Sequence, residues 1–220
     1  MELFIDTAKV SKIKQVFDNL PLTGVTTNPT LLSKEPESYI KTLLAIREVI
    51  GEEKLLHIQV VGETYDEMLE FYHELKKSVG GKIVIKVPVT TDGLKLMTYL
   101  KNNEDILVTA TAIFTANQAL LAAFCGVDYV APYVNRIDKI SGNGVQVVRE
   151  IVCIFEENNL DCKVLAASFK NSQQVKDVLL TGCQSLTVSA EILEEMADHP
   201  CTNSSIKQFE LDWKKLIDSY

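Results

Sequence analysis

Two kinds of segment alternate along the whole chain. Short runs rich in β-branched residues predict strands, and between most of them the apolar residues recur at helical spacing. The predicted strands are Leu3–Asp6, Gly24–Thr27, Leu56–Val61, Ile83–Pro88, Leu107–Thr111, Tyr129–Pro132, Lys163–Ala167 and Ser185–Val188. The predicted helices are Tyr39–Ile50, Tyr65–Val79, Gly93–Lys101, Thr115–Cys125, Gly144–Asn158 and Ser172–Thr181. The chain is therefore an α/β protein of repeated strand–helix units.

Polar residues near the ends of these strands choose between two folds. A doubly wound open sheet and a closed (β/α)8 barrel both alternate strands and helices. Parallel strands are covered on both faces and should be apolar, yet most runs carry a polar residue at or just beyond their carboxyl end, namely Asp6, Asn28, Gln59, Lys86, Thr111, Tyr133 and Ser168. In a barrel these ends converge on one mouth, where active sites lie. We predict a single (β/α)8 TIM barrel domain over residues 1–220.

The chain continues beyond the eighth predicted strand. An additional C-terminal helix is predicted over Ser204–Tyr220, and its apolar face consists of Ile206, Phe209, Trp213, Leu216 and Ile217. Such a face covers either the outside of the barrel or a neighbouring subunit. We favour the subunit contact and expect a homo-oligomer.

Charge and motif content disfavour several function classes. The chain has 22 basic and 30 acidic residues and a net charge of −8, so neither nucleic acid nor a membrane is an expected partner. The stretch Met1–Asp6 lacks the features of a signal peptide, which predicts a cytoplasmic protein. Five cysteines without C-x-x-C spacing and three scattered histidines predict reduced thiols and no metal. Ser141–Gly144 lacks the third glycine of a dinucleotide fingerprint, so no cofactor is expected.

Lys86 is the most unusual residue of the predicted strands. It stands within Ile83–Val89, which is otherwise apolar. Burial disfavours a charged ammonium group, and an uncharged amine is a nucleophile that forms imines with ketones. The alternative is a side chain that reaches from the strand end to water or to an acid. We favour a Schiff-base lysine.

Three other strand ends carry polar side chains that each have two interpretations. Asp6 is the only acid in its run and either takes part in catalysis or caps the next turn. Asn28 precedes a proline, so its amide either donates to a sugar hydroxyl or forms a turn. Gln59 lies between apolar residues and needs hydrogen-bond partners, which water or substrate could supply.

The sixth and seventh strand ends contain candidates for proton transfer and phosphate binding. Tyr133 could relay a proton and Arg136 could clamp a phosphate, although a surface pair between Arg136 and Asp138 is the alternative. Ser168 follows the seventh predicted strand, and this region of barrels often binds phosphate. The alternative for Ser168 is an N-cap of the helix that starts near Ser172.

Four motifs together resemble the small transaldolase family. They are Thr26-Thr27-Asn28-Pro29, Lys86-Val87-Pro88, Ala131-Pro132-Tyr133-Val134-Asn135-Arg136 and Ala166-Ala167-Ser168-Phe169-Lys170. They occur in the family's order and spacing, and the resemblance covers essentially the whole chain. It implies a (β/α)8 barrel with the Schiff-base lysine on the fourth strand, where Lys86 lies. It also implies a ring of subunits, commonly a decamer.

The resemblance also implies a role for single positions. It makes Lys86 the amine that forms the imine with the donor ketone, and Asp6 the acid near the bond that is cleaved. The set that holds a catalytic water comprises Gln59, Thr111 and Tyr133, with Tyr133 as the proton relay. The set that binds the hydroxyls and the phosphate of the substrate comprises Asn28, Thr26, Arg136 and Ser168.

Gln59 and Tyr133 distinguish two activities within the family. Transaldolases that resemble this chain carry a glutamate and a phenylalanine at these positions. A tyrosine that protonates the bound three-carbon enamine lets it leave as free dihydroxyacetone, whereas a phenylalanine cannot do so. The resemblance thus implies a class I aldolase that reversibly cleaves fructose 6-phosphate to dihydroxyacetone and glyceraldehyde 3-phosphate. The alternatives are a transaldolase, which transfers the three-carbon unit between sugar phosphates, and a catalytically silent barrel that binds a sugar phosphate.

Overall fold

A closed barrel of eight parallel strands forms the centre of the molecule in the computed structural model, which describes residues 1–219. Each strand pairs with its neighbours in the sequence, and β8 closes the barrel against β1. The strands are β1 Glu2–Asp6, β2 Gly24–Thr26, β3 Leu55–Gln59, β4 Ile83–Pro88, β5 Leu107–Ile113, β6 Tyr129–Pro132, β7 Lys163–Ala166 and β8 Ser185–Val188. The predicted (β/α)8 TIM barrel is confirmed.

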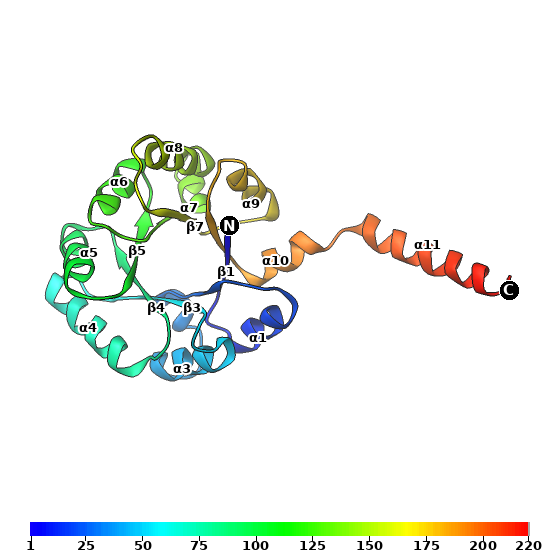
Figure 1. Cartoon of the computed structure of the whole chain (residues 1–220), viewed down its shortest axis with the longest axis horizontal. Coiled ribbons are helices and arrows are strands. Elements are labelled where there is room, and N and C mark those ends of the chain that lie inside the picture. Colours follow the sequence, from blue (N-terminus) through cyan, green and yellow to red (C-terminus); the bar gives the residue numbers. More distant parts are fainter. Residues whose placement is uncertain (220) are drawn as a thin grey trace.

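Helices follow the strands in the chain, and most of them surround the barrel (Figure 1). They are α1 Val10–Asn19, α2 Pro29–Leu32, α3 Tyr39–Ile50, α4 Tyr65–Ser78, α5 Thr91–Asn103, α6 Ala116–Phe124, α7 Val134–Lys139, α8 Gly144–Glu157, α9 Ser172–Leu179, α10 Ala190–Ala197 and α11 Pro200–Ile217. Side-chain caps define several of their starts. Thr64 with Glu67, and Thr115 with Gln118, form capping boxes, which satisfy backbone N–H groups that a helix start leaves unpaired.

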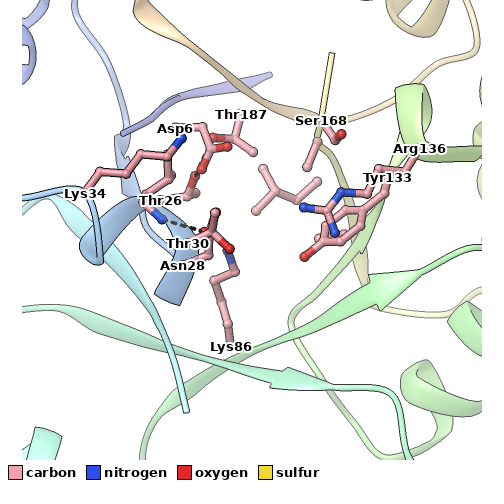
Figure 2. A pocket seen from close by; sticks show the side chains of 14 residues that line it. Asp6, Thr26, Asn28, Thr30, Lys34, Lys86, Tyr133, Arg136, Ser168 and Thr187 are labelled. Atoms are coloured by element: carbon pink, nitrogen blue, oxygen red, sulfur yellow. Dashed lines mark hydrogen bonds between the residues drawn. The ribbon is translucent and has the colours of Figure 1, made fainter. Parts of the chain in front are cut away.

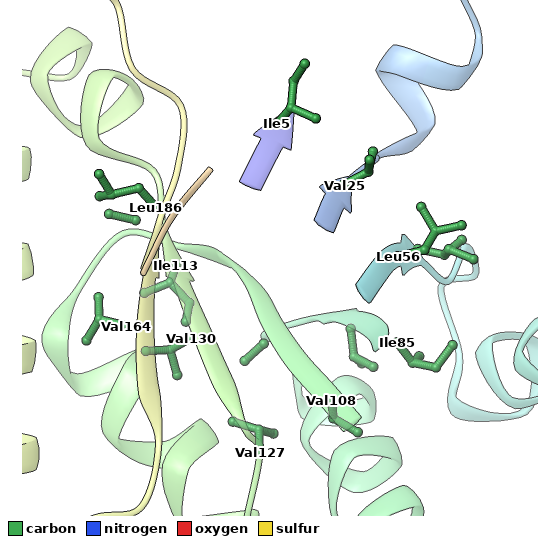
Figure 3. Packing of buried hydrophobic residues seen from close by; sticks show 14 of the residues in the cluster. Ile5, Val25, Leu56, Ile85, Val108, Ile113, Val127, Val130, Val164 and Leu186 are labelled. Carbon is green, nitrogen blue, oxygen red and sulfur yellow. The ribbon is translucent and has the colours of Figure 1, made fainter. Parts of the chain in front are cut away.

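The core has two parts because successive side chains of a strand point to opposite faces. The outward residues of the strands, among them Ile5, Val25 and Leu56, pack beneath the helices in the main core cluster (Figure 3). A separate small cluster of Phe4, Val84, Tyr129 and Leu165 fills the inside of the barrel. The interior is therefore packed at its lower end, which leaves the carboxyl ends of the strands for polar groups.

The sequence analysis does not predict α1, α2 and α7. The last two span four and six residues, which is too short for helical spacing to show. In α1, Val10, Ile13, Val16 and Phe17 do recur at helical spacing and pack on the core, so this helix had an available signal. The segment after β6 was expected to be a strand end rich in polar residues. In the structure it forms the short helix α7.

The C-terminal helix is longer at its start than predicted. α11 begins at Pro200 rather than Ser204, since proline suits the first position of a helix, and it ends at Ile217. Tyr220, the predicted end, lies outside the described residues. The helix extends away from the barrel (Figure 1) and has no buried residue. It therefore does not cover the outside of its own barrel.

Other sequence expectations concern membranes, metals and thiols. Among residues 1–219, no helix is long and apolar enough to cross a membrane. Over the same range, no group of three or more His, Cys, Asp or Glu side chains is placed so that it could hold a metal ion. All five cysteines are free thiols, of which Cys162 and Cys183 are buried.

Candidate active site

A cavity of about 220 Å³ opens at the carboxyl ends of the strands, in the mouth of the barrel. Figure 2 shows Lys86 at one side of it, between two groups of polar side chains. Asp6, Thr26, Asn28, Thr30 and Lys34 form one group, and Tyr133, Arg136 and Ser168 form the other. Most of the residues predicted for the site therefore line one cavity, although they come from distant parts of the sequence.

Lys86 lies on β4 and is 5% exposed. Its Nζ donates a hydrogen bond of 2.7 Å to the main-chain carbonyl of Thr27, which directly follows β2. The side chain thus neither reaches open water nor pairs with an acid, and its amine points into the mouth of the barrel.

Asp6 is held by a chain of hydroxyl groups. Its Oδ1 accepts a hydrogen bond of 2.7 Å from Thr26 Oγ1, which lies 2.6 Å from Thr187 Oγ1. The barrel around the carboxyl group raises the pKa of Asp6 by desolvation, and this effect outweighs the opposing charge of Lys86, the bond from Thr26 and the charge of Arg136. The carboxylate is therefore fixed next to the cavity and is a better proton acceptor than an exposed one.

Asn28 has a structural role at the start of α2, and its side chain can still bind a substrate hydroxyl. Its Oδ1 accepts a hydrogen bond of 3.0 Å from the N–H of Leu31 and caps α2. The cap uses only the oxygen, so the Nδ2 group remains a donor for a ligand in the cavity that Asn28 lines.

Tyr133 connects two other candidate residues. Its hydroxyl lies 2.9 Å from Thr111 Oγ1, and the guanidinium of Arg136 lies over its ring, 4.7 Å from the centroid. Asp138 accepts a hydrogen bond from the N–H of Gly144 and not from Arg136. The guanidinium therefore stays beside the cavity, where it could bind an anion in a bidentate manner.

Two residues of the barrel mouth have a left-handed backbone although neither is glycine. Ser168 has a φ of 62° and Ala112 a φ of 59°, conformations that are unfavourable by about 1–2 kcal/mol. The carbonyl of Ser168 accepts a hydrogen bond of 2.8 Å from the N–H of Asn135, and Asn171 rather than Ser168 caps α9. Ala112 lies where the pairing of β5 with β6 shifts register. The hydroxyl of Ser168 is thus free of the capping role and borders the cavity.

A comparison with known protein families gives a match over nearly the whole chain. The family described as transaldolase/fructose-6-phosphate aldolase matches residues 3–220. The chain belongs to this family. The suspected relationship to the small transaldolase family is confirmed.

Solved structures with the same barrel belong to other enzymes. A mandelate oxidase variant is 12% identical with a TM-score of 0.58, and the alignment covers 86% of this chain and 64% of that one. The flavin-binding domain of baker's yeast flavocytochrome b2 is 14% identical with a TM-score of 0.58, covering 86% and 56%. The transaldolase-family chain thus spans between about half and two thirds of their length. At such identities the likeness concerns the fold alone.

Two predicted site residues of this transaldolase-family chain do not line the cavity of Lys86. Gln59 is paired in register with Lys86 but lines a neighbouring cavity of about 440 Å³ with Pro29, Tyr39 and Phe71. Thr111 does not line the cavity of Lys86 either, yet its hydroxyl reaches that cavity through Tyr133. The structure therefore brings the predicted set together with the exception of Gln59.

Three polar residues of the cavity, Thr30, Lys34 and Thr187, were missed by sequence reasoning. Thr187 stands near the end of β8 and follows the same rule as the other strand-end residues, so its position in Ser185–Val188 was an available signal. Lys34 follows α2 in a turn, and a lysine in a loop gives no sequence signal because loops are usually polar.

Proposed function

We propose that the protein is a class I aldolase that reversibly cleaves fructose 6-phosphate into dihydroxyacetone and glyceraldehyde 3-phosphate. The observation that carries this proposal is the buried Lys86 amine, hydrogen-bonded to a neutral carbonyl beside a polar cavity. Such an amine attacks the ketone carbon of a sugar and forms an imine with loss of one water molecule.

Carbon–carbon cleavage follows from the imine. The imine is protonated on nitrogen. The carboxylate of Asp6 takes the proton from the hydroxyl on the fourth sugar carbon, the bond between the third and fourth carbons breaks, and its electron pair neutralises the positively charged imine nitrogen. Glyceraldehyde 3-phosphate leaves, and an enamine remains on Lys86. The raised pKa of Asp6 supports this role because a base needs some affinity for the proton that it accepts.

Release of the second product needs a proton. We assign its delivery to Tyr133 and Thr111, whose hydroxyl groups lie 2.9 Å apart, with a water molecule between the phenol and the enamine carbon. Protonation restores the imine, and a second water molecule hydrolyses it to dihydroxyacetone and the free amine. Tyr133 regains its proton from solvent, and Asp6 releases to solvent the proton that it took from the sugar hydroxyl, so the cycle is balanced.

Binding is assigned to the two groups that face each other across the cavity. Arg136 and Ser168 would hold the phosphate, since a guanidinium and a hydroxyl both donate to phosphate oxygens. Asn28 would donate to a hydroxyl of the three-carbon unit through Nδ2. Thr26 is already engaged with Asp6 and Thr187, so its contribution is to hold the carboxylate of Asp6.

A transaldolase that transfers the three-carbon unit to an acceptor aldehyde is the second candidate. The position of Gln59 favours it, because a glutamine that lines a neighbouring cavity is less suited to hold the water for enamine protonation. Without that water the enamine stays on Lys86 until an acceptor arrives.

Product counting distinguishes the candidates. Purified protein is given fructose 6-phosphate alone, and glyceraldehyde 3-phosphate released per active site is measured. Many equivalents support the aldolase. One equivalent, with turnover restored by erythrose 4-phosphate, supports the transaldolase. No release and no borohydride-trapped adduct on Lys86 would leave the silent sugar-phosphate-binding barrel.

Replacing Asp6 by asparagine is expected to separate activity from stability. Cleavage should fall by about a hundredfold because the base is lost. Because the pKa of Asp6 is raised, the folded wild-type protein binds this proton more tightly than the unfolded chain does. The free energy of unfolding therefore falls as the pH rises from 3.8 to the raised pKa of Asp6. Asparagine does not titrate and can still accept from Thr26. Thermal unfolding should therefore show the variant equal to wild type below pH 3.8 and increasingly more stable than wild type as the pH rises above 3.8. The same midpoint difference at every pH would contradict the assignment.

The exposed apolar face of α11 leads us to propose that the enzyme is a homo-oligomer, a decamer by family resemblance. Phe209 and Trp213 are 68% and 62% exposed, and large apolar groups in a row are a common mark of a protein interface. Sedimentation at micromolar concentration should give a multiple of 24.5 kDa. Trp213→Glu should dissociate the assembly, and Lys207→Glu, on the same helix, should not. A wild-type monomer would refute the proposal.

The cytoplasmic location of the protein stays a prediction.

A further inference from the structure

A polar pair lies inside the barrel, beneath the candidate active site. His57 of β3 and Thr109 of β5 are fully buried, and His57 Nδ1 lies 3.0 Å from Thr109 Oγ1. The ring of His57 makes edge contacts with Phe4 and Tyr129, at centroid distances of 4.8 and 5.3 Å. This bond joins the two strands that flank β4, the strand of Lys86.

The pair is placed directly below the residues assigned to proton delivery. Side chains two residues apart on a strand share a face, so Thr109 lies one step below Thr111 on β5. Thr109 is also paired in register with Lys86, and Thr111 is bonded to Tyr133. The side chain of His57 therefore connects, through one bond, to the strand that holds the Thr111–Tyr133 pair.

The main chain of His57 reaches the other side of Lys86. Its carbonyl accepts hydrogen bonds from Thr27 N at 2.9 Å and from Thr27 Oγ1 at 3.0 Å. The carbonyl of Thr27 in turn accepts from Lys86 Nζ at 2.7 Å. His57 thus contacts both Thr27, whose carbonyl holds the Lys86 amine, and β5, the strand that carries Thr111.

Neither a positive charge nor a gain in stability explains why a histidine occupies position 57. Burial lowers its pKa well below 6.5, and the charge of Lys86 adds to this effect, so the imidazole is neutral and is not a proton donor at working pH. Its Nε2 is buried without a hydrogen-bond partner in the described part of the chain, which is destabilising. An aromatic hydrocarbon ring would fill this place without that penalty.

We propose that His57 is a positioning residue whose bond to Thr109 holds β5 against β3 beneath Lys86 and so aligns Thr111 and Tyr133 with the enamine. The inference rests on the proposed imine chemistry. The need for such a bond is local, since β5 changes register just beyond Thr111, next to Ala112 with its left-handed backbone. A small displacement of a catalytic group can lower a rate strongly.

The test uses His57→Phe, Thr109→Val and the double variant. Each single change should lower kcat for cleavage of fructose 6-phosphate by about tenfold, and the double variant should lose no more, because both remove one bond. KM should stay within about twofold. Borohydride trapping of a ketose on Lys86 should keep its wild-type rate, since the bonds of Thr27 to the main chain remain. Ser185→Ala, which removes another buried interior bond, from Ser185 Oγ to the Val164 carbonyl at 2.8 Å, should leave kcat unchanged.

A second measurement does not depend on turnover. Amide hydrogen exchange of Thr111–Ile113 should be about tenfold faster in both single variants than in wild type and Ser185→Ala. Unchanged exchange, multiplicative losses of kcat, or parallel losses of kcat and trapping would overturn the proposal. Wild-type protein that neither cleaves nor forms an adduct would instead refute the proposed function, and the exchange result would then decide whether the bond holds β5.

Discussion

Arginine in place of Lys86 is expected to lower the turnover of fructose 6-phosphate by at least about a thousandfold, because the nucleophile itself is lost. A guanidinium keeps the positive charge and the donor groups but is always protonated and does not form an imine. Lys86 is 5% exposed and bonded to the Thr27 carbonyl, so its amine is held in a fixed place, and Lys34 is the other lysine that lines the cavity. Steady-state release of glyceraldehyde 3-phosphate measures the loss.

Two controls make this result specific. Lys82→Arg alters an exposed lysine that pairs with Glu53, and it should retain wild-type turnover. Lys86→Met removes the amine without the larger guanidinium, so it reports the same loss if arginine disturbs packing. Thermal unfolding of all variants checks that the barrel is intact. A Lys86→Arg protein with more than a tenth of the normal rate, or a borohydride adduct mapped to another lysine, would be incompatible with the imine on Lys86.

Phenylalanine in place of Tyr133 is expected to suppress release of free dihydroxyacetone by about a hundredfold or more, the usual contribution of a general acid. The enamine would still form, because Lys86 and Asp6 are unchanged, and transfer to erythrose 4-phosphate should persist. The phosphate contact should survive as well, since Arg136 lies over the ring of Tyr133 and not on its hydroxyl. One substitution should thus convert an aldolase into a transferase.

The measurement compares both reactions in the same preparation. Dihydroxyacetone release without acceptor and transfer with acceptor are followed in wild type, Tyr133→Phe and Thr111→Val. Thr111→Val keeps the phenol but removes its hydroxyl partner at 2.9 Å, so it should give an intermediate loss of release. Equal losses of both reactions in Tyr133→Phe would place Tyr133 in binding or cleavage instead of proton delivery.

Much of the barrel could be predicted because its physics is local. Buried parallel strands have to be apolar, so the alternation of short apolar runs and helical patterns located Ile83–Pro88, Tyr129–Pro132 and Ser185–Val188 with their observed bounds. Polar residues at the strand ends, such as Asp6 and Lys86, were visible as exceptions to that rule. They line one cavity because the barrel closes.

The remainder depended on the direction of side chains in three dimensions. Gln59 satisfied the strand-end rule, yet it lines the neighbouring cavity. Lys34 enters the site from a loop, and His57 lies within an apolar strand where a single histidine looks like ordinary core. No spacing rule pairs side chains of strands that are not neighbours, so the contact of His57 on β3 with Thr109 on β5 needed coordinates.

The left-handed conformations of Ala112 and Ser168 limit how this enzyme can be made more heat-resistant. Glycine adopts a left-handed backbone without strain, so a glycine at either position would relieve the local backbone strain. Glycine would also widen the range of shapes open to the unfolded chain and to the loops that frame substrate. Glycine at these two positions would therefore make the mouth of the barrel less selective for substrate. Stabilising substitutions should first be sought on the outer helices.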